Sequence, residues 1–293
     1  MWSVRDKTCL ITGATSGIGR ETALGLARSG ARLAIVARDR TLAAKVASEA
    51  RREGSPTVDL FFADLANQAD LRRAAGEILA KLPAIHVFIS NAGIVMNERE
   101  LTVDSVEKTF AVNHLAPFLL VKLLRERIEA AAPSRIIIVA SQVEARGVID
   151  FDDLTFAKSY TALGAYDRSK LANVLFTYEL ARRLHEKGVT VNCLHPGVIA
   201  TNLLCDYEKK SRLAGKLLRL THPGPKEGAA TTLRLATDPK LIYVSGRYFK
   251  PTGEERTSPA SYDRELARRL WEISEQLVGD AEALSNAKGG ALG

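Results

Sequence analysis

The chain has 293 residues, of which 46% are hydrophobic and 26% are charged, a composition typical of a soluble globular protein. No apolar run approaches the roughly 20 residues that a membrane-spanning helix needs. The net charge is +7, but basic residues are scattered among acidic ones and no nucleic-acid-binding motif accompanies them. We therefore expect one large α/β domain or two small ones, and no nucleic-acid partner.

The three cysteines, Cys9, Cys193 and Cys205, show no C-x-x-C spacing. Cys9 and Cys193 lie in apolar runs of the kind that form strands, which indicates reduced thiols in a core. Residues 1–7 lack the apolar segment of a signal peptide. These features favour a cytoplasmic protein. No group of His and Cys has the spacing of metal ligands, so no metal site is expected.

The first predicted strand, 8–12, leads into a glycine-rich turn, and a helical pattern follows from Ile18 to about Ser29. Glycine lets the backbone turn sharply and approach a ligand closely. The start of the helix then offers free N–H groups and a positive dipole end to a pyrophosphate. A purely structural turn is the alternative, but this position favours nucleotide binding. The residues expected at the site are Gly13, Thr15, Ser16, Gly17, Ile18 and Gly19.

The second predicted strand, 32–37, ends where an NAD-dependent enzyme usually places an acid that holds the adenine ribose hydroxyls. This chain has Ala37 and Arg38 there. The forked guanidinium of Arg38 can pair with a 2′-phosphate, and no acid at position 37 repels one. Asp39 is interpreted as the cap of the next helix, 41–53. The pattern favours NADP(H) over NAD(H), the alternative being that Arg38 is an ordinary surface arginine.

Strands and helices alternate along the rest of the chain. Such alternation predicts a parallel sheet with helices on both faces, whose ligands bind at the carboxyl ends of the strands. Further strands are predicted at 57–62, 86–90, 135–140, 190–194 and around 248–249, and helices at 68–81, 104–131, 166–186, 226–236 and 261–278. The residues that fall at strand ends include Gly13, Arg38, Asp64, Asn91 and Gly93. We predict a single domain over 1–280 and a flexible tail over 281–293.

A tyrosine and a lysine stand one turn apart at the start of the predicted helix 166–186. Tyr166 and Lys170 therefore share a face of that helix. A phenol ordinarily titrates near pH ~10, and an adjacent ammonium favours the phenolate and lowers that pKa. A pair of this kind can exchange a proton with an alcohol or a carbonyl. The same spacing occurs by chance in many helices, so its meaning depends on its neighbours.

Two polar residues are candidate neighbours of this pair. Ser141 follows the apolar strand 135–140, so its hydroxyl is expected at the same edge of the sheet. Asn113 lies within the predicted helix 104–131, just before Pro117. Proline has no N–H to give, so it is expected to kink that helix or to free a carbonyl near Asn113.

Two further segments carry less specific patterns. Asp150, Asp152 and Asp153 could suggest a cation site, but they lack ligand spacing, which favours surface acids. The segment 201–225 has an apolar side and a basic side and is expected to cover the substrate. Three interpretations stay open for it: a lid over a lipophilic substrate, peripheral contact with an anionic membrane, or an amphipathic lid without a lipid role.

Four motifs together resemble the short-chain dehydrogenase/reductase family, over about residues 7–250. They are Thr12 to Gly19 for T-G-x-x-x-G-x-G, Asn91-Ala92-Gly93 for N-A-G, Tyr166 to Lys170 for Y-x-x-x-K, and Pro196-Gly197 with Thr201 for P-G-x-x-x-T. Finer features are similar to the retinol dehydrogenase-like branch, among them the long stretch between Ser141 and Tyr166. The resemblance implies an α/β, single-domain, Rossmann-type doubly wound fold with a parallel sheet of about seven strands and helices on both faces.

The resemblance also implies a role for each motif residue. Tyr166 would be the general acid in reduction and the base in oxidation, and Lys170 would tune it and bind the nicotinamide ribose. Ser141 would bind the substrate oxygen, and Asn113 would hold a water that links Lys170 to solvent. The cofactor would be bordered by Asp64 and Leu65 at the adenine, by Asn91, Ala92 and Gly93 at the ribose, and by Pro196, Gly197, Val198 and Thr201 at the nicotinamide. Ser16 stands where many NADP-dependent members carry a basic residue, so the NADP(H) preference rests on Arg38.

The function implied is that of an NADP(H)-dependent alcohol dehydrogenase or carbonyl reductase acting by hydride transfer on a lipophilic alcohol, aldehyde or ketone. The alternative is a catalytically silent NADP-binding regulatory or interaction protein, which would usually lack a catalytic residue. Family members often associate through helices such as 104–131 and 166–187, so a homodimer or homotetramer is possible. Members of the branch often carry an apolar N-terminal anchor that this sequence does not show, so membrane contact is not expected.

Overall fold

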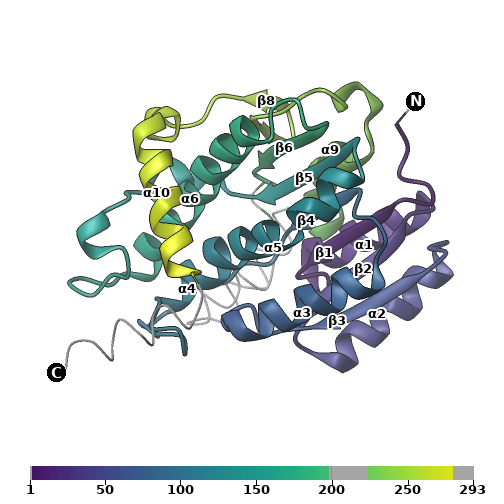
Figure 1. The fold of residues 1–293 in the computed structure, drawn as a ribbon, viewed down its shortest axis with the longest axis horizontal. Helices are drawn as coiled ribbons and strands as arrows, with labels where there is room; N and C mark the ends of the chain where they lie inside the picture. The colour runs from purple at the N-terminus through teal and green to yellow at the C-terminus, as the bar shows by residue number, and fades with distance from the viewer. Residues whose placement is uncertain (1, 198, 200–222, 280–293) are drawn as a thin grey trace.

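The computed structural model describes residues 2–197, 199 and 223–279. Its centre is an eight-stranded sheet in the order β3-β2-β1-β4-β5-β6-β7-β8 (Figure 1). Neighbouring strands from β3 to β7 are parallel, and β8 runs antiparallel to β7. The strands are β1 Thr8–Thr12, β2 Arg32–Ala37, β3 Val58–Phe62, β4 Val87–Ser90, β5 Ser134–Val139, β6 Val189–Leu194, β7 Arg247–Lys250 and β8 Gly253–Glu255.

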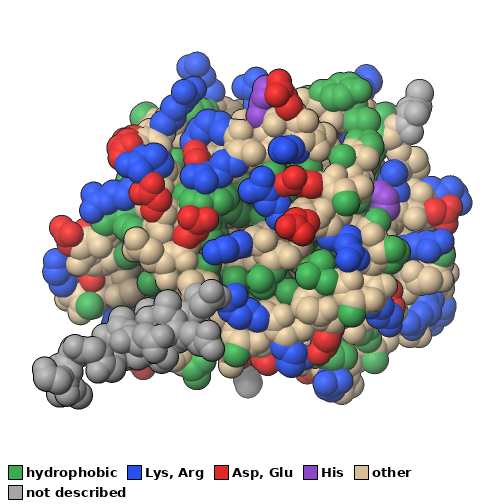
Figure 2. Space-filling model, in the orientation of Figure 1, with side chains coloured by type: hydrophobic (Ala, Val, Ile, Leu, Met, Phe, Trp, Pro, Cys, Tyr) green, Lys and Arg blue, Asp and Glu red, His purple; other side chains and the backbone are tan. Residues whose placement is uncertain are grey.

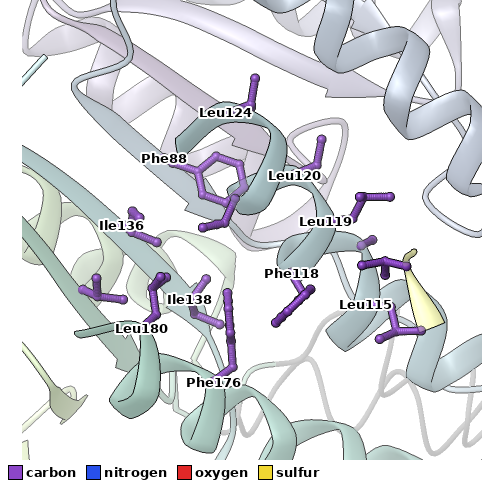
Figure 3. Packing of buried hydrophobic residues seen from close by; sticks show 14 of the residues in the cluster. Phe88, Leu115, Phe118, Leu119, Leu120, Leu124, Ile136, Ile138, Phe176 and Leu180 are labelled. Carbon is purple, nitrogen blue, oxygen red and sulfur yellow. The ribbon is translucent and has the colours of Figure 1, made fainter. Parts of the chain in front are cut away.

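Helices cover both faces of the sheet, as the alternation predicts (Figure 1). The longer helices are α1 Gly17–Arg28, α2 Arg40–Arg52, α3 Gln68–Lys81, α5 Ala116–Ala130, α6 Ala162–Arg183, α9 Pro225–Thr237 and α10 Arg264–Leu277. One apolar core joins the sheet to α3, α5, α6 and α10, and Figure 3 shows its centre around Phe88, Phe118 and Phe176. A second core joins the opposite face to α1, α2 and α9.

The strands read as continuous apolar runs because both sides of each central strand are buried. In β1, for example, Leu10 belongs to the first core and its neighbour Ile11 to the second. Parallel sheets that are covered by helices on both faces show this pattern. On the face shown in Figure 2, the side chains of Lys, Arg, Asp and Glu are interspersed.

The predicted helix 104–131 is interrupted. A short helix α4, Lys108–Phe110, leads into a π-helix, η1, Ala111–Leu115, before α5 begins. The N–H of Ala116 binds the carbonyl five residues earlier, at Ala111. Pro117 cannot donate to the carbonyl four residues before it, that of Asn113. The expected break is therefore present, but it takes the form of a widened turn, which recurs at functional sites.

The start of that helix was predicted at residue 104, and this position is wrong. Leu101 forms a β-bridge with Glu107. The buried Glu107 carboxylate then accepts hydrogen bonds from the N–H groups of Thr109 and Phe110. These bonds satisfy the free donors of the first turn, so the helix begins after Glu107.

Two other boundaries differ from the sequence prediction. α6 begins at Ala162, four residues before Tyr166, because the Thr161 hydroxyl caps the N–H of Gly164. α10 begins at Arg264, because Pro259–Tyr262 forms a 3-10 turn. The sheet has eight strands, in agreement with the prediction of about seven, and the short β8 folds back on β7 as a hairpin.

α10 packs against the catalytic helix α6 (Figure 1). Its Trp271 ring lies 4.9 Å from Phe118 on α5 and 5.8 Å from Phe176 on α6, measured between ring centroids. The Arg183 guanidinium covers the other aromatic surface of Trp271, 4.1 Å from the centroid. α10 therefore covers part of the surface that α5 and α6 form.

The described part of the chain contains two of the three cysteines. Cys9 and Cys193 are buried free thiols, as predicted. Within residues 2–197, 199 and 223–279, no cluster of His, Cys, Asp or Glu could hold a metal ion, and no helix has the length and apolar character to cross a membrane. Most of the predicted lid 201–225, Cys205 and the predicted tail 281–293 lie outside the described residues.

Candidate active site

The glycine-rich turn between β1 and α1 is locked onto the end of β4. The Asn91 amide donates hydrogen bonds to the carbonyls of Thr12 (3.3 Å) and Gly13 (3.0 Å). A Cβ at Gly19 would overlap the Gly13 carbonyl oxygen and the same Asn91 amide. Gly13 itself could carry no side chain, because a Cβ there would lie 2.7 Å from the Ala92 Cα. Asn91 and Ala92 therefore shape the turn as well as lying beside it.

The same turn leaves open space around Gly17 at the start of α1. Gly17 has a φ of +54°, and a Cβ there would meet nothing within 4 Å. Ser16, at the N-cap, makes no side-chain capping bond, and the first turn of α1 contains no acid. Free N–H groups in open space are what a bound pyrophosphate needs. The residues present therefore fit a dinucleotide, as the sequence predicts for Thr15 to Gly19.

The end of β2 presents an exposed cation. Arg38 is exposed, and Asp39 caps α2 by accepting a hydrogen bond from the Leu42 N–H at 2.9 Å. Arg20, in the first turn of α1, is paired with Glu21 (2.5 Å) and Glu49 (2.6 Å). Arg38 therefore remains the better placed of the two guanidinium groups for a 2′-phosphate.

The end of β3 carries Asp64 and Leu65. The Asp64 carboxylate accepts a hydrogen bond from the Ala66 N–H at 2.9 Å, and its own N–H donates to Asp70 at 3.1 Å. Leu65 is partly buried against the first core. Asp64 thus shapes the loop after β3, at the edge where the adenine is expected.

Tyr166, Lys170, Ser141 and Asn113 come together from three elements. The Lys170 ammonium lies 5.4 Å from the centroid of the Tyr166 ring and donates to the Val139 carbonyl at 2.9 Å. The Ser141 hydroxyl is close enough to the phenol to act on its pKa. A Cβ at Gly93 would lie 3.6 Å from the Lys170 nitrogen and 3.5 Å from the Asn113 amide oxygen. The four predicted catalytic residues therefore share one site.

The electrostatics of the tyrosine differ from the sequence expectation. Burial raises the pKa of Tyr166 to about 12, helped by the charge of Asp167, while the Ser141 hydroxyl acts in the opposite direction. Burial also lowers the pKa of Lys170 to about 8. The expectation that Lys170 lowers the phenol's pKa is not met in the chain alone, because desolvation outweighs the neighbouring cation.

The side chain of Asn113 is fully engaged within the protein. Its amide oxygen accepts from the Ile94 N–H (2.8 Å), and its amide nitrogen donates to the Ile94 carbonyl (2.9 Å) and to the Ser169 hydroxyl (3.0 Å). The group left for a water molecule is the Asn113 backbone carbonyl, which Pro117 deprives of its α-helical donor. The water proposed from the resemblance would therefore bind the backbone, not the side chain.

The end of β6 supplies the last part of the site. His195 is buried, and its backbone N–H donates to the Phe249 carbonyl at 2.8 Å. Burial lowers the pKa of the imidazole to about 4, and the charges of Lys250 and Lys170 act in the same direction. Pro196 and Gly197 follow at this edge, Gly197 with a φ of +96°. Val198 and Thr201, the predicted carboxamide contacts, lie outside the described residues.

Three contacts of the site were not predicted from the sequence. Ser169 was given no role, yet it links Asn113 to the turn that carries Tyr166, since its hydroxyl donates to the Tyr166 carbonyl at 2.7 Å. After burial, the charges of Lys250 and Lys170 also lower the pKa of His195, and the charge of Asp167 adds to the effect of burial in raising the pKa of Tyr166. A separate cavity of about 700 Å³ contains none of the four catalytic candidates and is lined by Tyr178, Tyr248, Tyr262 and their neighbours.

We predict that Gly19→Ala lowers the stability of the fold by about 1–3 kcal/mol, because the new methyl group overlaps the Gly13 carbonyl and the Asn91 amide. It should also weaken binding of a nicotinamide dinucleotide at least ~10-fold, because the turn must move. Thermal unfolding and fluorescence titration measure the two effects. Gly76→Ala is the control: its Cβ meets nothing within 4 Å on α3, so it should stabilise by about 0.5–1 kcal/mol. Unchanged binding in Gly19→Ala would contradict the geometry described for the turn.

Comparisons with known proteins identify the family to which the chain belongs. The family profile described as short chain dehydrogenase matches residues 7–212. Human retinol dehydrogenase 14 is 43% identical over 294 residues, covering 94% of this chain and 87% of its own. A crystal structure of an uncharacterised protein from Mycobacterium paratuberculosis superposes with a TM-score of 0.76 at 31% identity, covering 94% of both chains.

An NAD(P)-dependent gluconate 5-dehydrogenase from Beutenbergia cavernae, solved with bound NADP, superposes with a TM-score of 0.69 at 27% identity. This match covers 85% of the present chain and 96% of the other. The chain belongs to the short-chain dehydrogenase/reductase family, in its retinol dehydrogenase-like branch.

Proposed function

We propose that this protein is an NADP(H)-dependent oxidoreductase that interconverts a lipophilic alcohol and its aldehyde or ketone. The observation that carries the proposal is the convergence of Tyr166, Lys170 and Ser141 beside the turn that fits a dinucleotide. The second candidate, a silent NADP-binding protein of the same fold, has less support, because the catalytic set is complete and spatially assembled.

In the proposed mechanism, Ser141 and Tyr166 bind the oxygen of the substrate. Bound NADP(H) supplies the hydride in reduction and accepts it in oxidation. In reduction the phenol of Tyr166 donates its proton to the carbonyl oxygen, and in oxidation the phenolate removes the proton from the alcohol. With the coenzyme bound, further acceptors would keep Lys170 charged, and its charge would then favour the phenolate. The Asn113 carbonyl can hold a water near Lys170, through which the proton reaches solvent.

The preference for NADP(H) is supported by the end of β2. Arg38 is exposed there and follows Ala37 rather than an acid. Its guanidinium can donate two parallel hydrogen bonds to a 2′-phosphate. Its neighbour Arg40 is turned to the Phe62 ring, 4.0 Å from the centroid, and is less available. The gluconate 5-dehydrogenase from Beutenbergia cavernae, which has the same fold, was solved with NADP.

A lipophilic substrate is supported by apolar side chains that face solvent near the site. Leu101 and Val103 are exposed on the loop after β4, and Val148 and Leu163 on the segment between Ser141 and Tyr166. These two segments touch, since the Tyr160 hydroxyl donates to the Met96 carbonyl at 2.7 Å. The similarity to a retinol dehydrogenase makes retinoids one class to test, beside other aldehydes, ketones and steroids. A cytoplasmic location and a homo-oligomer stay predictions.

Tyr166→Phe should lower kcat for carbonyl reduction by about 10³-fold or more, because the variant has no proton to donate, while the Kd for NADPH changes less than about twofold. The measurement is NADPH oxidation with a panel of aldehydes, ketones, retinaldehyde and steroids, beside a binding titration. Tyr243→Phe is the control, since Tyr243 is 90% exposed, and it should keep wild-type activity. Substantial turnover in Tyr166→Phe would refute the assigned role.

Arg38→Ala should raise the KM for NADPH about 10-fold or more and leave the KM for NADH nearly unchanged, because the 2′-phosphate alone loses its partner. Arg32→Ala removes an exposed charge from the opposite end of the same strand and should alter neither value. Steady-state kinetics with each coenzyme give the comparison. Equal changes with NADPH and NADH would overturn the proposed 2′-phosphate contact.

A further inference from the structure

The residue after the candidate catalytic tyrosine forms an ion pair with the segment that carries Ser141. The Asp167 carboxylate accepts two hydrogen bonds from Arg146, Nε to Oδ2 at 2.9 Å and Nη2 to Oδ1 at 3.1 Å. Asp167 is 6% exposed, whereas the Arg146 side chain is 61% exposed. The pair is thus a two-pronged contact between a buried carboxylate and a guanidinium that reaches it from the surface.

Arg146 and Ser141 belong to one short turn. The 3-10 helix η2, Gln142–Arg146, has Ser141 as its N-cap, and the Ser141 hydroxyl accepts from the Val143 N–H at 3.4 Å. Ser141 therefore lies at the start of this turn and Arg146 at its end. Because the turn is so short, a contact that fixes Arg146 against α6 also restricts where Ser141 can lie relative to Tyr166.

The packing beneath the pair is tight. A Cβ at Gly147 would lie 2.6 Å from the Asp167 carbonyl oxygen and 2.6 Å from the Leu171 Cβ, so η2 ends in direct contact with α6. The next residue of α6, Arg168, donates to the Val148 carbonyl at 2.8 Å, and its guanidinium lies 3.6 Å from the centroid of the Phe156 ring. Two consecutive residues after Tyr166 therefore hold the segment that follows Ser141.

We propose that Arg146 and Asp167 are positioning residues, which hold the Ser141 turn against α6 at the residue that directly follows Tyr166. The inference rests on the proposed function, because it assigns the pair to the proton donor of that reaction. It extends that function by naming two residues that act on the donor without touching substrate or coenzyme.

Asp167 and Arg146 carry opposite charges, so removing one or the other is expected to change the pKa of the Tyr166 phenol in opposite directions. The negative charge of Asp167 raises the pKa of the phenol, after burial, which is the larger cause. The guanidinium of Arg146 offsets part of that charge. The other polar and titratable groups around the phenol are Lys170 on the same helix, Ser141 at the start of η2, and His195 directly after β6.

The test compares the pH profile of kcat for NADP⁺-dependent alcohol oxidation between variants of the pair. Asp167→Asn removes the negative charge, so the phenolate forms more readily and the midpoint should move down by about half a pH unit or more. Arg146→Gln removes the positive charge that offsets the Asp167 carboxylate, so the phenolate forms less readily and the midpoint should move to higher pH. The double variant should have the same midpoint as Asp167→Asn. Arg146→Lys keeps the positive charge, so it should have the wild-type midpoint with a reduced kcat.

Glu179→Gln is the matched control. It also removes a carboxylate from α6, but one that pairs with Arg182 and Arg183 more than three turns beyond Tyr166. It should leave the midpoint unchanged. If the pair served the fold alone, both single variants would lower activity or stability without moving their midpoints in opposite directions, and that result would overturn the proposal.

A second measurement needs no substrate. The ultraviolet absorbance of phenolate is titrated in the NADP⁺ complex of the wild-type protein and of each variant. The same titration with Tyr166→Phe added to each is subtracted, and the difference gives the pKa of Tyr166. The same opposite shifts are expected. If the protein showed no turnover with any alcohol or carbonyl, the proposed function would be refuted. The titration would still decide whether the Arg146–Asp167 pair acts on Tyr166. Shifts of the same sign, or none, would refute the pair's role whether or not the chain is an enzyme.

Discussion

The buried ammonium of Lys170 is the group around which the site is arranged. It is 3% exposed, and the described residues give it one hydrogen-bond acceptor, the Val139 carbonyl. An ammonium has three donors, and leaving donors unsatisfied in a buried place is unfavourable. Burial alone lowers the pKa of Lys170 to about 8. Further oxygen acceptors, such as ribose hydroxyls or a water on the Asn113 carbonyl, would stabilise the charged form.

The fold determines which groups can surround that ammonium. Val139 ends β5, Gly93 follows β4 and His195 follows β6, and these three parallel strands are neighbours in the sheet. Their carboxyl ends meet at one edge, where α6 delivers Lys170 and Tyr166, and where the turn before α1 leaves its N–H groups free. Catalytic groups and the expected phosphate site thus share one edge because the strands are parallel.

Much of this arrangement could be predicted from the sequence. Strands buried on both faces leave apolar runs that are easy to recognise, and Asp39 before α2 is a cap that the structure confirms. The alternation of strands and helices places Ser141 at the sheet edge, and helical spacing places Tyr166 and Lys170 on one face. The family resemblance adds Asn113 and joins the four residues into one set. Local patterns and topology carry this information.

Features that depend on contacts between distant residues could not be predicted. The Arg146–Asp167 pair joins residues 21 positions apart, and the Asn113–Ser169 contact joins residues 56 apart. The raised pKa of Tyr166 depends on how much water the folded chain excludes, which residue spacing does not encode. The bridge between Leu101 and Glu107 likewise displaced a helix start that local pattern favoured.

The central claim is tested most directly by a crystal structure of the protein with NADP⁺. The account predicts that the nicotinamide lies beside the Tyr166 hydroxyl, that the Lys170 ammonium binds the adjoining ribose hydroxyls, and that the pyrophosphate covers Gly17. A coenzyme bound elsewhere, or side chains at 166 and 170 that point away from the nicotinamide, would contradict it.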